Sequence, residues 1–264
     1  MDSIPESHVL TLTGERTLPN LTDENYWFRR HEVAYQAVLD PSVPNPSVPN
    51  RAVSCRNATV LDAGCGEGYG AHLLAGVASR VVAVDYDTAA TAHAAVTYPD
   101  LTVLRANLVA LPLGTSAVDV VVCLQVIEHL WDQPAFLAEC ARVLRPGGTL
   151  VVSTPNRLTF SPGRDTPLNP FHTRELTATE LAGLLGEAGF GAHRMLGVWH
   201  GSRLRDLDRR HGGSLVAAQL ATPAADWSVA LRRDVASVTA RDFALDDHDV
   251  DTSLDLLAVA TLTR

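Results

Sequence analysis

The fold is decided by residues 60–70, which read VLDAGCGEGYG. An apolar pair is followed by the acid Asp62 and then by glycine at alternate positions, Gly64, Gly66 and Gly68. An apolar run that ends in closely spaced glycines is typical of a buried strand that turns sharply into a helix. Glycine lets the backbone come close to a ligand, and the N–H groups at the start of the helix can donate to it. The stretch therefore predicts a ligand-binding loop after the first strand of an α/β sheet.

A second acid follows this loop at a sequence spacing that is typical of nucleoside-binding sites. Asp85 ends the next apolar run, 21 residues after Gly64, where a carboxylate can accept both ribose hydroxyls. A dinucleotide fingerprint needs glycine at its first, third and sixth places, but counting from Gly64 puts Tyr69 at the sixth. A pyrophosphate site is thus disfavoured, although a frame from Gly66 to Ala71 leaves it open.

Apolar runs and helical segments alternate on both sides of the loop. Runs typical of buried parallel strands lie at 60–61, 81–84, 101–104, 118–124 and 149–153. Helical segments lie between them at 71–77, 89–96 and 134–144. This alternation predicts an α/β fold with a doubly wound sheet, whose ligand lies beyond the carboxyl ends of the strands.

We interpret residues 1–264 as one domain with additions. The first part is an N-terminal lid (1–57), with a helix at 22–39 and a proline-rich insertion at 41–50. A cofactor-binding core (58–200) follows and ends in a helix at 177–188 and a strand near 192–199. The last two parts are a helical insertion (201–251) and a closing strand (252–264). The segment 201–251 is too long for a plain connection. We expect it to form part of the acceptor wall, or to contact a second copy in a homodimer.

Composition narrows the classes of function. The chain of 264 residues has a formal net charge of −9, which argues against nucleic acid or an anionic membrane surface as partner. No apolar run approaches the span of a bilayer, and the N-terminus lacks a signal pattern; we expect a soluble, cytoplasmic protein. All 21 basic residues are arginine, which excludes lysine-dependent Schiff-base and P-loop chemistry. The four cysteines form no CxxC pair, so zinc-knuckle and redox motifs are absent.

The order of motifs resembles the class I S-adenosylmethionine-dependent methyltransferases over residues 58–156. The loop resembles their motif I, 119–130 resembles their fourth strand with its "EHL" sequel, and 144–148 matches their "LRPGG" turn. This resemblance implies a Rossmann-like, seven-stranded sheet with an antiparallel last strand, and S-adenosylmethionine as cofactor. The residues that it assigns to the cofactor are Asp62, Gly64, Gly66, Gly68, Asp85, Tyr86, Asn107, Leu108 and Gln125.

Segments outside this core are similar to a narrower group, the mycobacterial sugar 1-O-methyltransferases of methylmannose polysaccharide biosynthesis. The segments that carry the similarity are 12–16, 25–31, 127–131, 153–156, 160–165, 169–175 and 211–214. The similarity implies that the acceptor is a small saccharide, in particular the 1-OH of a 3-O-methylated mannoside.

Methyl transfer to a hydroxyl needs a base, and two histidines are candidates. His129 follows the fourth strand at the edge where the methyl group should point, and His172 lies in the irregular loop after the fifth strand. A structural role at a helix start or in a proline-rich loop is the alternative for each. Glu128 orients the imidazole of His129 or binds a divalent ion. Some related enzymes carry a Glu-x-x-Glu-His metal set, in which Gln125 here replaces the first Glu, so Mg²⁺ is left open.

Further candidates lie on the N-terminal helix and near His172. Tyr26 and Trp27 are candidates for contact with the sugar, with a place in the core as the alternative for Trp27, and Arg30 for the methionine carboxylate. Asp165 and Arg174 are candidates for binding acceptor hydroxyls.

Three rival functions remain open at this point. A quinone or small-phenol O-methyltransferase would have a deep apolar pocket, whereas a polar pocket with an aromatic rim would favour a sugar. A nicotinamide-dependent reductase would be stabilised by a different nucleotide. A cofactor-sensing module would bind the nucleoside without turnover.

Overall fold

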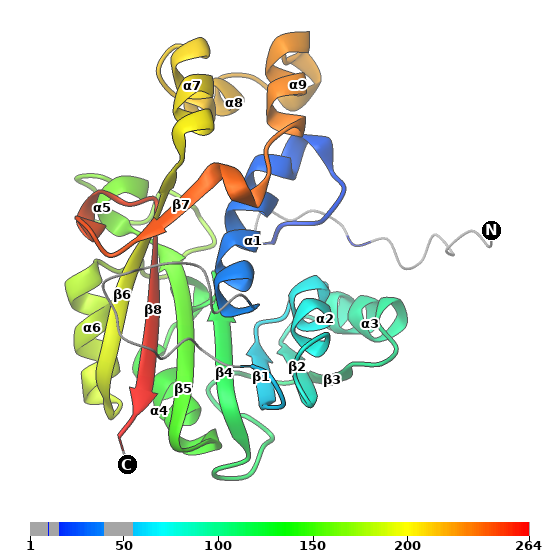
Figure 1. The fold of residues 1–264 in the computed structure, drawn as a ribbon, viewed down its shortest axis with the longest axis vertical. Coiled ribbons are helices and arrows are strands. Elements are labelled where there is room, and N and C mark those ends of the chain that lie inside the picture. The colour runs from blue at the N-terminus through cyan, green and yellow to red at the C-terminus, as the bar shows by residue number, and fades with distance from the viewer. Residues whose placement is uncertain (1–9, 11–15, 40–54, 264) are drawn as a thin grey trace.

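The computed structural model describes residues 10, 16–39 and 55–263, and its centre is a single mixed sheet (Figure 1). Eight strands are found in these ranges, in the order β3-β2-β1-β4-β5-β8-β6-β7. They are β1 (Thr59–Ala63), β2 (Arg80–Asp85), β3 (Thr102–Arg105), β4 (Val118–Leu124), β5 (Leu144–Pro155), β6 (Phe190–His200), β7 (Phe243–Asp246) and β8 (Asp255–Leu262). Strands β1 to β5 pair in parallel, and β8 lies antiparallel between β5 and β6. The predicted α/β class and the antiparallel last strand are confirmed.

The predicted number of seven strands is wrong. The additional strand, β7, lies inside the segment 201–251 that we predicted to hold only helices and loops. It pairs antiparallel with the end of β6, from Gly197↔Asp246 to His200↔Phe243. A strand of four residues carries too little alternation to be recognised, and it forms because the returning chain meets the free edge of β6.

Helices follow the first, second and fourth strands, as expected. The α-helices of the described ranges are α1 (Asn25–Leu39), α2 (Tyr69–Ala75), α3 (Thr88–Thr97), α4 (Gln133–Val143), α5 (Arg157–Phe160), α6 (Ala178–Glu187), α7 (Ser202–Arg210), α8 (Leu215–Leu220) and α9 (Val229–Ala236). The helix predicted from residue 22 begins with a 3-10 turn, Thr22–Glu24, before α1. The proline-rich insertion at 41–50 lies outside the described residues. No helix in the described ranges is long and apolar enough to cross a bilayer.

The sheet is covered on both faces, because alternate strand residues point to opposite sides. On one face Leu61 and Val121 belong to a cluster with Phe136 of α4 and Leu181 of α6. On the other face Val60 and Val120 pack with residues of α1 and α2, among them Tyr35 and Leu74. This layering leaves the carboxyl ends of the parallel strands open toward α1.

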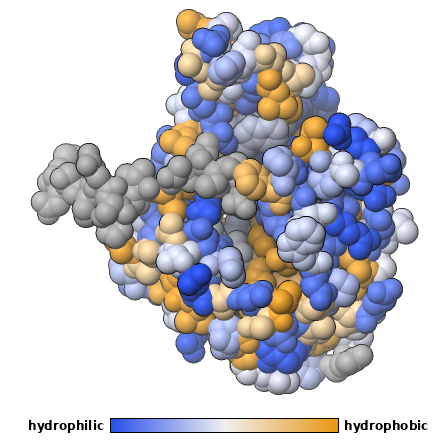
Figure 2. Space-filling model, turned by 180° about the vertical axis from the view of Figure 1, so that it is seen from behind, coloured by the Kyte–Doolittle hydropathy of each residue, from blue (hydrophilic) through white to orange (hydrophobic). Residues whose placement is uncertain are grey.

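The insertion forms a separate lobe above the sheet. Figure 1 shows α7, α8 and α9 beyond the end of β6, and in Figure 2 the lobe stands above the body of the molecule. Its core contains Leu204, Leu215 and Leu231 together with Tyr26 and Val33 of α1. Helix α1 therefore packs against the sheet with one part and against the insertion with another.

Tyr35 and Asp62 attach α1 to the first strand. A β-carbon added to Gly70 would lie 2.0 Å from Cζ of Tyr35, so the tyrosine ring fits only over glycine. The Tyr35 hydroxyl donates to both carboxylate oxygens of Asp62, at 3.2 Å each. Asp62 is fully buried. Burial raises the pKa of Asp62 to about 7, the Tyr35 hydrogen bond opposes this shift, and the charge of Asp85 adds to it.

Because the pKa of Asp62 is raised in the folded state, folding favours its protonated form. The corresponding stabilisation is complete below the ordinary carboxyl pKa near 4 and is lost as the pH rises through about 7. We expect Tm to fall by a few degrees between pH 5 and pH 8, and we expect this fall to be smaller in Asp62→Asn. Thermal denaturation across this range measures it, with Asp226→Asn on an exposed 3-10 turn as control. Parallel curves for wild type and Asp62→Asn would contradict the assignment.

Candidate functional site

A cavity of about 1510 Å³ opens where the parallel strands end. One end is lined by the glycine loop after β1, by the residues after β2 and by Asn107 and Leu108 after β3. The other end is lined by α1, by the loop after β5 and by the insertion. Ligand pockets usually measure 300–1,000 Å³, so this cavity has room for more than one small molecule.

The glycine loop touches the turn that follows β4. Gly64 has a φ of 85°, and a β-carbon there would lie 2.4 Å from Cγ2 of Val126. Gly64 and Cys65 donate their N–H groups to the carbonyl of Val84 in β2, at 2.7 and 3.0 Å. The loop is therefore held flat against the cavity, where its backbone is within reach of a ligand.

Asp85 fixes the loop from the neighbouring strand. Its Oδ2 accepts from the N–H of Gly66 at 2.8 Å, and its Oδ1 accepts from the N–H of Asp87 at 2.9 Å. Each carboxylate oxygen has a further lone pair for a ligand hydroxyl. Tyr86 lines the cavity beside it and is 69% exposed.

Two predicted cofactor residues do not line the cavity. Asp62 is fully buried and faces Tyr35, because alternate residues of β1 point to opposite faces of the sheet. Gly68 has a φ of 99° and precedes α2, and a β-carbon added there would lie 2.9 Å from side-chain atoms of both Ala94 and Tyr98. Both residues support the loop from behind instead of facing the ligand.

The chain turns sharply after β4 at Gln125. This residue has a φ of 57°, in the left-handed region that costs a non-glycine residue energy. Its N–H donates to the carbonyl of Ser153 in β5 at 2.9 Å, and its side-chain Nε2 donates to the Ser153 hydroxyl at 3.3 Å. Such strain is typical of functional sites, and Gln125 lines the cavity.

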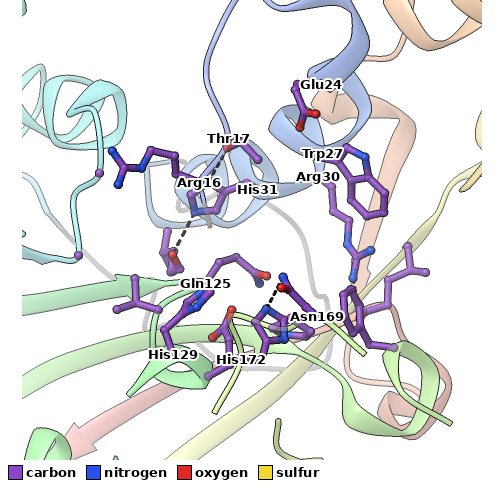
Figure 3. A pocket seen from close by; sticks show the side chains of 18 of the residues that line it. Arg16, Thr17, Glu24, Trp27, Arg30, His31, Gln125, His129, Asn169 and His172 are labelled. Carbon is purple, nitrogen blue, oxygen red and sulfur yellow. Dashed lines mark hydrogen bonds between the residues drawn. The ribbon is translucent and has the colours of Figure 1, made fainter. Parts of the chain in front are cut away.

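The structure brings Glu128, His129 and His172 together. Each offers a ligand atom within 4.8 Å of the others, and the two imidazole rings lie 4.9 Å apart in an edge-to-face arrangement. Figure 3 shows both histidines beneath Gln125, at the floor of the cavity. The residues come from loops 43 positions apart in the sequence, which the parallel pairing of β4 with β5 brings side by side.

Hydrogen bonds set the tautomer of each histidine. Nδ1 of His129 lies 3.0 Å from the carbonyl oxygen of Phe171; since a carbonyl only accepts, Nδ1 carries the proton and Nε2 carries the lone pair. Nδ1 of His172 donates to Glu175 at 2.7 Å. Nε2 of His172 accepts from Nδ2 of Asn169 at 3.1 Å. The Phe171 N–H donates to Oδ1 of the same amide, which fixes this orientation.

Glu128 is a buried acid between these groups and the sheet. Its side chain accepts a hydrogen bond from the Thr154 hydroxyl at 3.0 Å. Burial raises the pKa of Glu128 to about 8. Near neutral pH the carboxyl group is therefore mostly protonated, unless a cation approaches it.

Helix α1 presents Trp27, Arg30 and His31 to the cavity, since residues three and four positions apart share one helix face. The Tyr26 side chain points away from the cavity, so our prediction that it contacts the sugar is wrong. It is fully buried, and its hydroxyl donates to Nε2 of His200 at 2.7 Å. Arg30 also departs from our prediction, because Nε and one terminal nitrogen bind the buried Asp255 at 2.6 and 2.5 Å.

Asp165 and Arg174 do not line the main cavity, contrary to our prediction. Both border a separate cavity of about 70 Å³ behind the His172 loop, and Arg174 lies 3.6 Å from Glu180. The loop places His172 inward, and the irregular backbone that decides this carries no periodic pattern in the sequence.

Several lining residues were not predicted, among them Arg16, His31, Asn169, His200 and Asp208. The spacing of His31 four positions after Trp27 is a signal that points to the same helix face. The insertion contributes Asp208, Gly213, Ser214, Val216 and Leu220 to the wall. Nothing in their local sequence indicates this, because it depends on how the lobe packs against α1.

Comparison with known proteins agrees with this geometry. A family model described as a methyltransferase domain matches residues 61–152. A Mycobacterium tuberculosis protein named as a probable S-adenosylmethionine-dependent methyltransferase is 57% identical over 258 residues, 96% of this chain and 89% of that protein. A ubiquinone biosynthesis O-methyltransferase of Caulobacter vibrioides is 40% identical over 105 residues, 38% of this chain and 41% of that protein.

Among solved structures, a SAM-dependent methyltransferase of Thermotoga maritima is similar with a TM-score of 0.58. The sequences are 17% identical, and the match covers 90% of this chain and 93% of that one, so this likeness shows the fold alone. With the extended similarity to the mycobacterial protein, the chain belongs to the S-adenosylmethionine-dependent methyltransferases, and S-adenosylmethionine is its cofactor.

Proposed function

We propose that the protein transfers the methyl group of S-adenosylmethionine to a hydroxyl of a small saccharide. The acceptor hydroxyl that we propose is the 1-OH of a 3-O-methylated mannoside in methylmannose polysaccharide biosynthesis. The cofactor follows from the family. The acceptor rests on the resemblance of segments outside the core and on the lining of the cavity.

The acceptor end of the cavity carries the proposal, because it combines aromatic rings with many hydrogen-bonding groups. Its aromatic and polar lining residues include Trp27, Phe160, Asn169, His200, Asp208 and Ser214. A sugar ring presents hydroxyls in several directions, and these groups can pair with them.

The quinone or small-phenol alternative has less support. A planar apolar ring needs a deep apolar pocket, whereas the acceptor end combines apolar side chains such as Val216 and Leu220 with the hydrogen-bonding groups named above. The likeness to the ubiquinone enzyme is confined to 38% of this chain. The insertion, which lines the acceptor end, is therefore a better guide to the acceptor than the shared core.

In the proposed reaction the acceptor oxygen forms a bond to the methyl carbon as the carbon–sulfur bond breaks. The products are a methyl ether and S-adenosylhomocysteine, and the hydroxyl proton must leave. We propose that Nε2 of His129 accepts this proton, while Nδ1 of the same ring donates to the Phe171 carbonyl. His172 is oriented by Glu175 and Asn169 and is assigned to binding the sugar. Trp27 and Asn169 position the ring.

The Glu128, His129 and His172 cluster also fits a divalent cation. Both imidazoles are held through Nδ1 by a carbonyl or a carboxylate, as is usual for metal-ligating histidines. Nε2 of His129 and the Glu128 carboxylate would then be ligands, and Nε2 of His172 would become the third by giving up its hydrogen bond from Asn169. Two imidazoles suit Zn²⁺ or Mn²⁺ better than Mg²⁺, which prefers oxygen. When bound, such an ion would supply a Lewis acid for the acceptor hydroxyl.

The acceptor proposal is tested by methyl transfer from labelled cofactor to a panel of mannosides, free sugars and quinols. We expect transfer to 3-O-methylated mannosides that have an open 1-OH, and none when the 1-OH is already methylated. If a quinol is methylated more efficiently than every mannoside, the sugar proposal is contradicted and the quinone alternative is established.

The role of Asp85 is tested by cofactor binding. We expect Asp85→Ala to weaken the affinity for S-adenosylmethionine by about 2–3 kcal/mol, because two ribose hydroxyls lose their acceptor. Calorimetry measures this, and Asp226→Ala on the surface is the control. An unchanged affinity in a folded Asp85→Ala protein would exclude the ribose assignment.

The role of His129 is tested by kinetics. We expect His129→Ala to lower kcat by roughly a hundredfold or more with little change in cofactor affinity. His172→Ala should raise the acceptor KM more than it lowers kcat.

The reverse pattern would exchange the roles of the two histidines. Loss of activity with EDTA, restored by Mn²⁺ or Zn²⁺, would assign both histidines to a metal site and withdraw His129 as the base. If both variants keep most of their turnover, neither residue takes the proton.

A further inference from the structure

The charge of the cavity lining bears on how the cofactor is held. S-adenosylmethionine carries a positive sulfonium, a positive ammonium and a negative carboxylate. The acidic lining residues are Glu24, Glu67, Asp85, Asp87, Glu128 and Asp208, and the arginines are Arg16 and Arg30. The acids suit the two positive groups of the ligand. The carboxylate needs a cation that can turn to it.

Arg30 is not available for this role. Its guanidinium makes a two-pronged ion pair with Asp255, at 2.6 and 2.5 Å, and donates to the Leu254 carbonyl at 2.8 Å. Both side chains are at least nine-tenths buried. Taking Arg30 away would leave a buried, uncompensated carboxylate, which is strongly destabilising.

Arg16 is held much more loosely. Its terminal nitrogens lie 3.4 Å from the carboxylate of Asp87. The Arg16 side chain is only 15% exposed, whereas that of Asp87 is 43% exposed. Oδ1 of Asp87 also accepts from the N–H of Ala90 at 2.7 Å and so caps α3. If Arg16 leaves, Asp87 remains solvated and hydrogen-bonded, so the exchange costs little.

The residue that follows Arg16 is linked to the end of β4 through His31. The hydroxyl of the next residue, Thr17, is 3.4 Å from Nδ1 of His31, and Nε2 of His31 donates to the carbonyl of Leu124 at 3.1 Å. Leu124 ends β4, directly before Gln125. Figure 3 shows the guanidinium of Arg16 turned away from His31. The arginine thus starts beside the end of β4 and reaches toward Asp87, next to the ribose acid Asp85.

His31 does not compete for this role. Its Nε2–H is used by the Leu124 carbonyl, so Nδ1 accepts, and the Tyr69 hydroxyl donates to it at 3.0 Å. Burial lowers the pKa of His31, and the ring stays neutral near pH 7. Its contacts tie α1, α2 and β4 together around the cofactor end of the cavity.

We infer that Arg16 binds the α-carboxylate of S-adenosylmethionine, and that it exchanges Asp87 for this carboxylate when the cofactor enters. This role is separate from the acceptor and from the proton transfer.

The test compares S-adenosylmethionine with decarboxylated S-adenosylmethionine by calorimetry, without any acceptor. We expect Arg16→Gln to weaken binding of the carboxylated form by roughly tenfold to a hundredfold, the range for a hydrogen bond to a charged group. Binding of the decarboxylated form should change by less than about twofold or become tighter. Arg16→Lys should restore part of the loss.

Two further variants sharpen the comparison. Arg209→Gln, at an exposed arginine of α7, should change neither affinity. Asp87→Asn keeps a capping side chain on α3 and removes the competitor of the carboxylate, so the ratio of the two affinities should move in favour of the carboxylated form. An equal loss for both ligands in Arg16→Gln, no loss for either, or a fall of the ratio in Asp87→Asn would overturn the inference. Because no acceptor is present, these results are independent of the sugar proposal.

Discussion

The side chain of Val126 fills the space beside Gly64 in which a β-carbon would lie, and the rest of the site depends on this contact. Strands β1 and β4 are neighbours in the sheet, but the chain visits β2 and β3 between them. The turns that follow β1 and β4 therefore meet where the strand order reverses, which is where doubly wound sheets bind their ligands. With no side chain at Gly64, the cofactor loop and the turn that carries Gln125, Glu128 and His129 can lie in contact.

Helix α1 connects the two ends of the cavity. It is fixed to the first strand by Tyr35 on Asp62 and to the last strand by Arg30 on Asp255. Between these anchors, one face presents His31 to the cofactor end and Trp27 to the acceptor end. The Tyr26 hydroxyl hydrogen-bonds His200 at the end of β6, and His200 in turn hydrogen-bonds Asp208 of the insertion. The proposed cofactor and acceptor sites thus share one helix, which would keep the donor and the acceptor in a constant relation.

Buried acids give the site its chemical character. Glu128 is buried and holds its proton more tightly than an exposed acid, while Glu175 pairs with His172. Glu175 and the Phe171 carbonyl set which nitrogen of each histidine can accept a proton or bind a cation. The chemistry of the two imidazoles therefore depends on groups that themselves do not touch the acceptor.

The sequence by itself determined the parallel part of the sheet and the cofactor loop. The glycines from Gly64 and the acid at Asp85 were predictable because strand, turn and helix signals are local, and because parallel strands bring their carboxyl ends to one edge. The similarity of the motifs to known methyltransferases agrees with this local reading. The tertiary structure alone decided that Tyr26 and Asp62 turn away from the cavity. It also decided that Arg30 pairs with Asp255, 225 residues away. Asp165 and Arg174 lie behind the loop that carries His172, and β7 adds an eighth strand, for the same reason. These outcomes depend on which of several polar partners a side chain meets once distant segments pack, and no local pattern in the chain carries that information.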